Sequence, residues 1–322
     1  MNNCLVTGAS GFVGRELCRY LHESKKVKIK AFSRRPGEGC WDRLICWDFG
    51  DGLMPVEELA GIDTVFHLAG IAHDFRSNSE IDSLYKKINT EITVNLAEAA
   101  AEKGVSRFVF ASSVKAGGSP PEGVCADEQY PGEPEGIYGK TKRDAEVKLL
   151  EIGRKSGMHV SIIRPALVYG PGVKGNLRMM LSGIDRGWFP PLPETANIRT
   201  MVHVDDLVKA LVLAAESKEA TGEVFIVTDG KHYSSRQIFN EMCVAVGRKI
   251  PKWFVPRMFF LFLAAVGDLI GRFFKVPFDT YRYRKMFKDD CYSSAKIQDL
   301  LNFKPEKCLS DALPEMVRNY RK

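Results

Sequence analysis

The sequence lacks most of the features that mark specialised protein classes. It has no CxxC pair or other spacing typical of metal ligands, so no metal site is predicted. It has no basic tract with interleaved aromatic residues, which argues against a nucleic-acid partner. Its eight cysteines are scattered, and reduced structural thiols are the expected state. No basic and apolar leader precedes the first predicted strand, so a cytoplasmic location is expected.

The chain does contain a regular alternation of short apolar runs with longer helical patterns. Its 322 residues are 45% hydrophobic, which is enough to bury a large core in one large domain or two unequal ones. Several runs apolar on both faces fit parallel strands that are covered by helices. The predicted fold is therefore α/β, with a doubly wound parallel sheet. The predicted strands are 4–7, 28–32, 64–68, 107–111, 160–164 and 224–227.

A glycine-rich turn follows the first predicted strand and leads into a helical pattern. Residues 7–14 read TGASGFVG. Gly8 would permit a tight turn, Gly11 would let a pyrophosphate approach the backbone, and Gly14 would allow the helix to pack on the strand. The order of strand, glycines and helix predicts a dinucleotide-binding turn, with a purely structural turn as the alternative. Phe12 and Val13, which lie in the same turn, are further candidates for contact with the dinucleotide.

The end of the second predicted strand bears on which dinucleotide is bound. An acidic residue there would select NAD through the ribose 2′-hydroxyl, but the chain reads Ser33-Arg34-Arg35. Two guanidinium groups and a hydroxyl suit a 2′-phosphate. The predicted cofactor is therefore NADP(H), with NAD(H) as the alternative. A solvated basic turn is the competing interpretation.

Further candidates for cofactor contact follow the next strands. Asp48 follows a further probable strand, which lies between the predicted strands 28–32 and 64–68, and its side chain could face the adenine. Leu68, Ala69 and Gly70 stand at the end of the strand 64–68, and a cofactor could pass along these small residues. Each of these positions is equally compatible with an ordinary loop.

Tyr138 and Lys142 stand four residues apart and therefore share one face of a predicted helix. A nearby ammonium and a nicotinamide cation would lower the pKa of the phenol from its ordinary value of about 10. Tyr138 could then move protons during hydride transfer. The same spacing is common on solvated helices, so the neighbouring motifs decide between the two interpretations.

Those motifs occur in a characteristic order: the glycine turn, HLAG at 67–70, SS at 112–113, YGKTK at 138–142, RPALVYGPG at 164–172 and VHVDD at 202–206. This set resembles the extended short-chain dehydrogenase/reductases, specifically the NAD-dependent epimerase/dehydratase family, and the resemblance covers nearly the whole chain. It implies a Rossmann domain for the cofactor and a smaller, discontinuous C-terminal domain for a nucleotide sugar. The expected boundaries are 1–168 with 198–228 for the first, and 169–197 with 229–322 for the second.

The resemblance implies three catalytic residues. Ser113 matches the hydroxyl that binds the reacting sugar oxygen, Tyr138 the acid/base, and Lys142 the partner that binds the nicotinamide ribose. Elementary chemistry agrees, because hydride transfer at a sugar carbon requires one proton to move on the adjoining oxygen. Asn89 matches an asparagine that supports the lysine, although a helix-facing amide without that role is equally plausible. Pro165 joins the expected cofactor contacts.

The expected substrate is a nucleotide sugar, taken as UDP-linked, and a homodimer is left open. Asn176 resembles the family asparagine that contacts the substrate phosphates, and Arg199 resembles the arginine that pairs with its pyrophosphate. Lys115 would either reach a substrate oxygen or cap a strand end.

Departures from the family pattern narrow the expected reaction. Val114 and Lys115 stand where 4,6-dehydratases have an Asp-Glu pair, and Gly117 and Gly118 stand where epimerases commonly have Tyr-Gly. The runs SSVK at 112–115 and VKGNL at 173–177 resemble bacterial 4-keto-reductases that make N-acetylated 6-deoxy sugars for surface polysaccharide. Reduction of a UDP-4-keto-6-deoxy-N-acetylhexosamine is the expected activity. The alternatives are a UDP-sugar 4-epimerase and an inactive nucleotide-binding scaffold or sensor.

An apolar segment at 253–274 is too short and too often interrupted by charge to span a membrane. We expect it to pack mainly inside the substrate domain, with Trp253, Phe254, Phe260, Leu261, Ala264 and Ala265 inward and with Arg257 and Asp268 solvated. The alternative is an amphipathic face, within 253–285, that contacts a membrane or a partner subunit. The basic residues that keep this alternative open are Arg272, Lys275, Arg282, Arg284 and Lys285.

Overall fold

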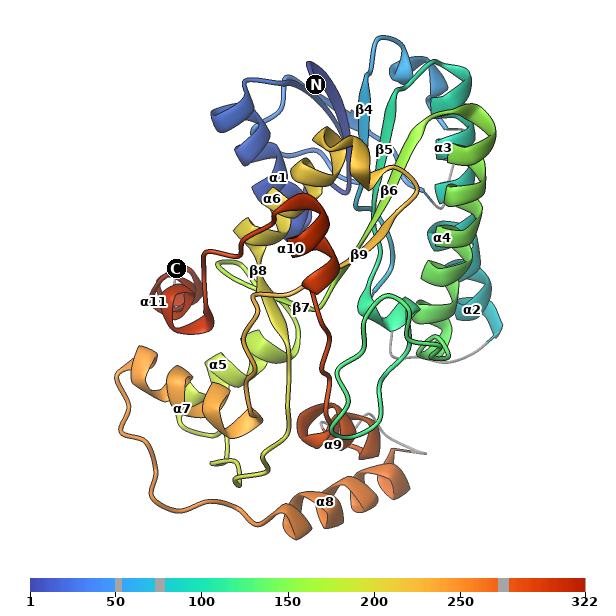
Figure 1. Cartoon of the computed structure of the whole chain (residues 1–322). Coiled ribbons are helices and arrows are strands. Elements are labelled where there is room, and N and C mark those ends of the chain that lie inside the picture. The colour runs from blue at the N-terminus through green and yellow to red at the C-terminus, as the bar shows by residue number, and fades with distance from the viewer. Residues whose placement is uncertain (50–53, 73–78, 272–277, 322) are drawn as a thin grey trace.

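The computed structural model describes residues 1–49, 54–72, 79–271 and 278–321, and its centre is a seven-stranded parallel sheet (Figure 1). The strand order is β3-β2-β1-β4-β5-β6-β9, which reverses direction beside β1 as in a doubly wound fold. The predicted doubly wound parallel sheet is confirmed. The strands are β1 (Asn3–Thr7), β2 (Lys28–Ser33), β3 (Arg43–Cys46), β4 (Thr64–His67), β5 (Arg107–Ala111), β6 (His159–Pro165) and β9 (Val224–Val227).

Helices cover both faces of this sheet, because its strands are apolar on both sides. On one face lie α1 (Phe12–Tyr20), α6 (Val204–Glu216) and α10 (Ala295–Leu301), which pack against alternate strand residues such as Val6. On the other face lie α3 (Ile92–Glu102) and α4 (Gly136–Ser156), which pack against the residues in between, such as Leu5. The period-2 alternation of β1 thus serves two cores at once.

A second hydrophobic cluster lies beyond the carboxyl ends of the strands. It is built by α5 (Asn176–Arg186), α7 (Ser235–Val246), α9 (Thr280–Phe287) and α11 (Leu309–Arg321). A separate two-stranded sheet of β7 (Leu167–Tyr169) and β8 (Met201–His203) connects this region to the main sheet. The domain boundaries expected from the sequence stay a prediction. Helix α10 lies late in the chain, among segments of the second cluster. Its Ile297 and Leu301 nevertheless pack into the hydrophobic core between the main sheet and helices α1 and α6.

The remaining helical pieces are short or lie at the edge of the molecule. They are α2 (Ser79–Tyr85), α8 (Arg257–Ile270), η1 (Leu21–Lys25), η2 (Val56–Leu59), η3 (Lys86–Glu91), η4 (Val114–Ala116) and η5 (Lys218–Ala220). No helix of the described residues is both long and apolar enough to cross a membrane.

Helix α8 contradicts the expectation that the apolar segment packs mainly inside. Only Phe260, Ala264 and Gly267 of this helix are buried, whereas Trp253, Phe254 and most other large side chains of the segment are exposed. The segment has more apolar residues than one narrow contact stripe can cover, and α9 is the element it packs against. Arg272 and Lys275 lie outside the described residues.

Candidate active site

The glycine turn brings the backbone of β1 close to the end of β4. Gly8 has a φ of +67°, and a Cβ there would lie 2.9 Å from the backbone nitrogen of Ala69. A Cβ at Gly14 would lie 2.2 Å from the Gly8 carbonyl oxygen, so the helix can approach the strand only because this residue is glycine. Gly11 caps α1 without any side-chain bond, which leaves the amino end of the helix to an outside acceptor.

The end of β2 is fixed to this turn by two hydroxyl groups. The Oγ of Ser33, which is buried, donates to the Oγ of Ser10 at 2.7 Å. Arg34 and Arg35 follow at the carboxyl end of the strand, and both side chains are exposed. Asp48 is exposed just after β3, the strand beside β2. The structure therefore places these predicted residues on one edge of the sheet, beside the glycine turn.

Asn89 and Lys142 meet at Gly70. A Cβ at Gly70 would lie 2.9 Å from Oδ1 of Asn89 and 3.3 Å from Nζ of Lys142. Asn89 is fully buried, and its amide pairs with the backbone of Ile71 in both directions, accepting at 2.8 Å and donating at 3.0 Å. It therefore fixes the chain just after β4, beside the lysine.

Lys142 is buried, with its ammonium group directed at the carboxyl end of β5. Its Nζ donates to the carbonyl oxygen of Ala111 at 2.9 Å and lies 4.4 Å from the centre of the Phe110 ring. Burial lowers the pKa of Lys142 to about 8, and the negative charge of Glu146 opposes this shift.

Tyr138 stands one turn earlier on α4, beside Ser113 at the end of β5. Burial raises the pKa of Tyr138 to about 12, and the neighbouring Ser113 hydroxyl opposes this shift by favouring the ionised phenol. The expectation that a neighbouring ammonium lowers this pKa is therefore wrong for the chain by itself. The physical reason is that the Lys142 ammonium donates to the carbonyl oxygen of Ala111, while the half-buried phenol loses much of its hydration.

A buried ion pair that the sequence analysis missed lies beneath these residues. Arg164, on β6, donates through Nε to Glu146 Oε1 at 2.8 Å and through Nη2 to Oε2 at 2.5 Å. Ser112 donates to the same carboxylate at 2.5 Å. Because a charged residue inside a fully buried strand needs a partner, the arginine in the run 160–164 was the available signal.

The three predicted substrate residues are placed differently. Lys115 donates to Glu135 at 2.7 Å, just before the start of α4. Arg199 donates to the backbone carbonyl of Lys285, and its Nη2 lies 4.0 Å from Asp290. Asn176 is the first residue of α5 and is exposed after Gly175.

One charged residue connects the first two of these positions. The positive charge of Lys285 acts on Glu135, the partner of Lys115, and Arg199 binds the backbone of Lys285. Among the described residues, no hydrogen bond or ion pair joins Asn176 to this group. The Nε of Arg199 is buried and lacks a hydrogen-bond partner among the described residues, which leaves a donor for a further acceptor.

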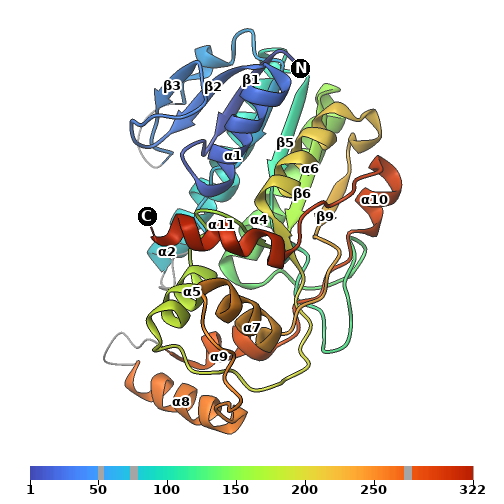
Figure 2. The same cartoon turned by 90° about the vertical axis from the view of Figure 1, so that its left-hand side faces the viewer.

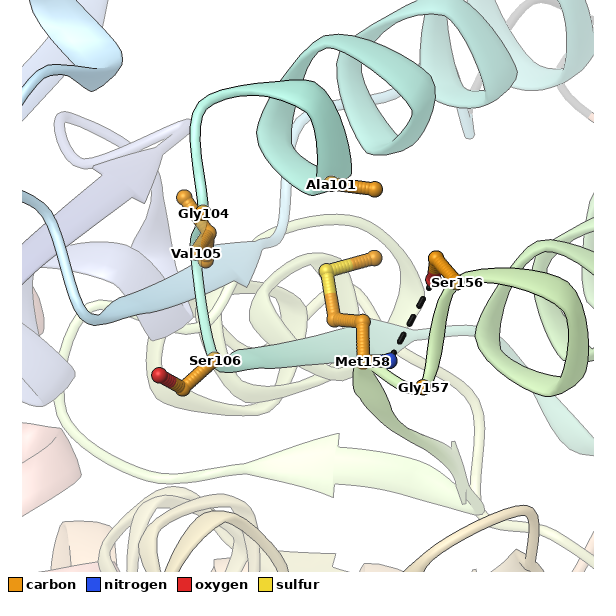
Figure 3. A pocket seen from close by; sticks show the side chains of 7 residues that line it. All are labelled: Ala101, Gly104, Val105, Ser106, Ser156, Gly157 and Met158. Carbon is orange, nitrogen blue, oxygen red and sulfur yellow. Dashed lines mark hydrogen bonds between the residues drawn. The ribbon is translucent and has the colours of Figure 1, made fainter.

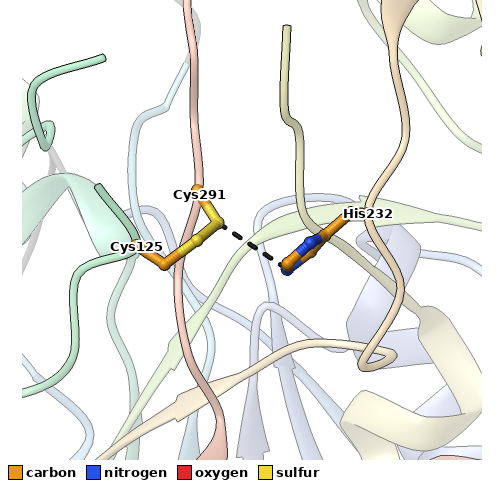
Figure 4. Close-up of side chains that lie close together, drawn as sticks. All are labelled: Cys125, His232 and Cys291. Atoms are coloured by element: carbon orange, nitrogen blue, oxygen red, sulfur yellow. Dashed lines mark hydrogen bonds between the residues drawn. A yellow bond between two sulfur atoms is a disulfide. The ribbon is translucent and has the colours of Figure 1, made fainter. Parts of the chain in front are cut away.

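Cys125 and Cys291 form a disulfide, with His232 beside it (Figure 4). The Nε2 of His232 lies 3.7 Å from the sulfur of Cys291. The expectation of reduced thiols is therefore wrong for these two cysteines, and the other six are free. No spacing rule could reveal a pair separated by 166 residues, which the fold brings together where Ala126 bridges to Tyr292.

A hollow of about 290 Å³ lies at the amino ends of the strands, at the end of the sheet opposite to the glycine turn and Ser113 (Figure 3). Its lining includes Val105 and Ser106, before β5, and Met158, before β6. Ligands of doubly wound sheets bind beyond the carboxyl ends of the strands, whereas this hollow lies at the amino ends. The predicted cofactor and catalytic residues lie at the other end, so we do not assign the site to this hollow.

A doubly wound sheet, a glycine turn and a Ser-Tyr-Lys set at the end of β5 together define an enzyme of the extended short-chain dehydrogenase/reductase type. The chain belongs to the NAD dependent epimerase/dehydratase family, whose model matches residues 4–228. The family resemblance and the Rossmann-like fold predicted from the sequence are thereby confirmed.

Individual relatives are similar over most of their length. A UDP-glucose 4-epimerase of Vibrio cholerae is 34% identical over 263 residues, which cover 78% of this chain and 77% of that protein. An Escherichia coli O157:H7 protein named N-acetyl-alpha-D-glucosaminyl-diphospho-ditrans,octacis-undecaprenol 4-epimerase is 29% identical, with 79% and 76% covered. The solved structure of MoeE5 in complex with UDP-glucose and NAD is 25% identical, with a TM-score of 0.78 and 99% of each chain covered.

Proposed function

We propose that the protein transfers a hydride at C4 of a nucleotide-linked sugar. The observation that carries this proposal is that the Ser113 hydroxyl lies close enough to the Tyr138 phenol to favour its ionised form, with Lys142 one turn further along the same helix. Ser113 would bind the sugar O4, Tyr138 would move the proton on that oxygen, and Lys142 would bind the nicotinamide ribose. The nicotinamide, when bound, supplies or accepts the hydride.

The residues present fit a dinucleotide. The amino end of α1 has no side-chain cap, and the glycines let this turn pack tightly against the backbone at the end of β4, which leaves backbone N–H groups available to a phosphate. Gly70 likewise lets the chain after β4 pass close to Asn89 and Lys142. These features support cofactor binding along the line from β1 to β5.

The preferred direction is reduction of a 4-keto sugar, and the charge state of Tyr138 is compatible with it. With a pKa of about 12, the phenol is protonated at neutral pH and is ready to give a proton to the oxygen formed when a keto group is reduced. A neutral reduced nicotinamide would leave this state in place, whereas the oxidised cation would favour the phenolate. The proposed substrate, from the resemblance of the runs 112–115 and 173–177 to 4-keto-reductases, is a UDP-4-keto-6-deoxy-N-acetylhexosamine for surface polysaccharide.

The exposed pair Arg34 and Arg35 supports NADP(H) as the cofactor. Both side chains lie at the carboxyl end of β2, where a dinucleotide places its adenosine ribose. Guanidinium groups bind a 2′-phosphate through paired, charge-assisted hydrogen bonds.

A 4-epimerase is the second candidate, favoured by the names of the two relatives from Vibrio cholerae and Escherichia coli. In that case the carrier of the sugar could be a nucleoside diphosphate, as in the first name, or a polyprenyl diphosphate, as in the second. An epimerase regenerates its NAD in each turnover and keeps it bound, whereas a reductase must release the spent cofactor.

This difference gives the test. The purified protein is dialysed, its bound dinucleotide is identified by mass spectrometry, and it is then supplied with NADPH and the 4-keto sugar nucleotide. Reductase function predicts that the cofactor dialyses away and that NADPH is consumed in proportion to sugar. Tightly held NAD, with inversion at C4 of a UDP-hexose and no net NADPH consumption, would establish the epimerase instead.

A further inference from the structure

Helix α8 carries an outer face without any polar side chain. Its buried residues Phe260, Ala264 and Gly267 form a single stripe at helical spacing. On the opposite side, Met258, Phe262 and Leu269 recur at the same spacing and are 72%, 67% and 62% exposed. We call this side, with the exposed Phe259 and Ala265, the outer face of α8.

The two charged residues of α8 are directed toward α9 rather than outward. The Nε of Arg257 donates to the Tyr283 hydroxyl at 2.8 Å. The Oδ1 of Asp268 accepts from the backbone nitrogen of Thr280 at 3.1 Å. The charges that would ordinarily make a surface helix soluble on its outer side therefore serve the contact with α9.

Positive charge is concentrated in this helix and in the segments on either side of it in the chain. The described residues 248–271 and 278–288 contain eight lysines and arginines and only two acidic residues, a net charge equal to that of the whole chain. The basic residues are Arg248, Lys249, Lys252, Arg257, Arg282, Arg284, Lys285 and Lys288. An apolar face bordered by cations complements a bilayer that carries anionic headgroups.

The position of α8 allows this contact. Figures 1 and 2 both show it at the end of the molecule opposite the amino terminus, on the outside of the second cluster. Exposed Trp253 and Phe254 precede it, and an aromatic pair of this kind is favoured at the boundary between lipid and water.

We propose that the outer face of α8 docks on an anionic lipid bilayer, with the helix lying in the plane of the interface. Phe259, Phe262 and Leu269 enter the acyl boundary, while exposed basic residues of the preceding segment, such as Lys249 and Lys252, bind the headgroups. This inference goes beyond the proposed function and does not depend on it.

Docking would place the membrane close to the predicted substrate residues. Helix α9 packs against α8, and the carbonyl of its Lys285 accepts the hydrogen bond from Arg199. A bilayer that orders α8 and α9 would therefore act next to this arginine.

The full-length protein is sedimented with vesicles of phosphatidylcholine, with and without phosphatidylglycerol, at low and high salt. We expect binding to the anionic vesicles, weaker binding at high salt, and little binding to neutral vesicles. Replacing Phe259 and Phe262 with Ser should lower the partition coefficient by about 100-fold or more. The matched control replaces Val244 and Leu300 with Ser. These are exposed apolar residues on α7 and α10, and the control should bind like the wild type.

A second measurement is independent of the behaviour of that double variant. Lipids with brominated acyl chains should quench wild-type tryptophan fluorescence, and the quenching should be largely lost in Trp253→Phe. Equal sedimentation of the wild type, the Phe259/Phe262 variant and the control, or no quenching, would overturn the proposal. So would analytical ultracentrifugation that shows a lipid-free dimer dissociated by the Phe259/Phe262 change, because the outer face would then bind a second copy.

Discussion

The ammonium of Lys142 donates to the carbonyl oxygen of Ala111 at 2.9 Å, so the helix that carries Tyr138 is tied to the strand that leads to Ser113. One hydrogen bond thus fixes the relative positions of the elements that carry the three predicted catalytic residues. Placing a charged group there has a cost, because the surroundings of Lys142 favour its neutral form.

That cost predicts an effect of Lys142→Met on stability. The folded chain loses the Lys142 proton at a pKa of about 8 and the unfolded chain near the ordinary lysine pKa of 10.5, so the unfolded state binds more protons between these pH values. Wild-type stability should therefore rise with pH across this window. At pH 7 the free energy of unfolding of the Met variant should exceed that of the wild type by about 1 to 3 kcal/mol. The loss of the hydrogen bond from Lys142 to Ala111 reduces this gain.

Urea unfolding at several pH values measures this. The advantage of Lys142→Met should shrink between pH 8 and 10.5, whereas Lys140→Met, at an exposed position on the same helix, should show the wild-type pH dependence. A Met variant that is less stable than the wild type at pH 7 would show that Lys142 is held without penalty.

Tyr138→Phe tests the proton transfer. Removing the hydroxyl should lower turnover by about 100- to 10,000-fold, since the proton on the substrate oxygen then has no donor. Cofactor affinity, measured by fluorescence titration, should change little. Tyr20→Phe serves as the control, and turnover in Tyr138→Phe equal to that of the control would remove Tyr138 from the mechanism.

Replacing Arg34 and Arg35 with Ala tests the choice of cofactor. Affinity for NADPH should fall about 10- to 100-fold or more, as expected when charge-assisted contacts to a phosphate are lost, while affinity for NADH should barely change. Arg154→Ala, at the far end of α4, is the control. Equal losses for both cofactors would show that the pair does not bind the 2′-phosphate.

Cys125→Ser tests the disulfide. Because the bond closes a long segment of chain, its loss should lower the free energy of unfolding by about 2 to 4 kcal/mol. Reduction of the wild type should produce a similar decrease. The exposed free thiol of Cys46 offers a control, and a Cys125→Ser melting temperature equal to that of Cys46→Ser would mean that the bond does not stabilise the fold.

The parts of the molecule that the sequence predicted are those governed by local pattern. Strands β1 and β5 carry an apolar run within a few residues, and the glycines at 8, 11 and 14 have steric requirements that act over one turn. The prediction of these elements needed no knowledge of distant contacts.

The parts that were missed depend on contacts across the chain. The bond between Cys125 and Cys291 and the pair of Glu146 with Arg164 exist only once the sheet has formed. Helix α8 shows a different limit, since an apolar periodicity indicates that a face avoids water but not what covers it. The pKa of Tyr138 was misjudged because helical spacing does not tell where the Lys142 side chain points.

The central claim is hydride transfer to C4 of a sugar nucleotide, and isotope transfer tests it most directly. The protein is incubated with NADPH deuterated at both C4 positions of the nicotinamide and with UDP-4-keto-6-deoxy-N-acetylhexosamine, and the product is examined by mass spectrometry and NMR. We expect one deuterium at C4 of the sugar, and we expect Tyr138→Phe to form this product at least about 100-fold more slowly. A reduced sugar without deuterium at C4, or no sugar product while NADPH remains intact, would contradict it.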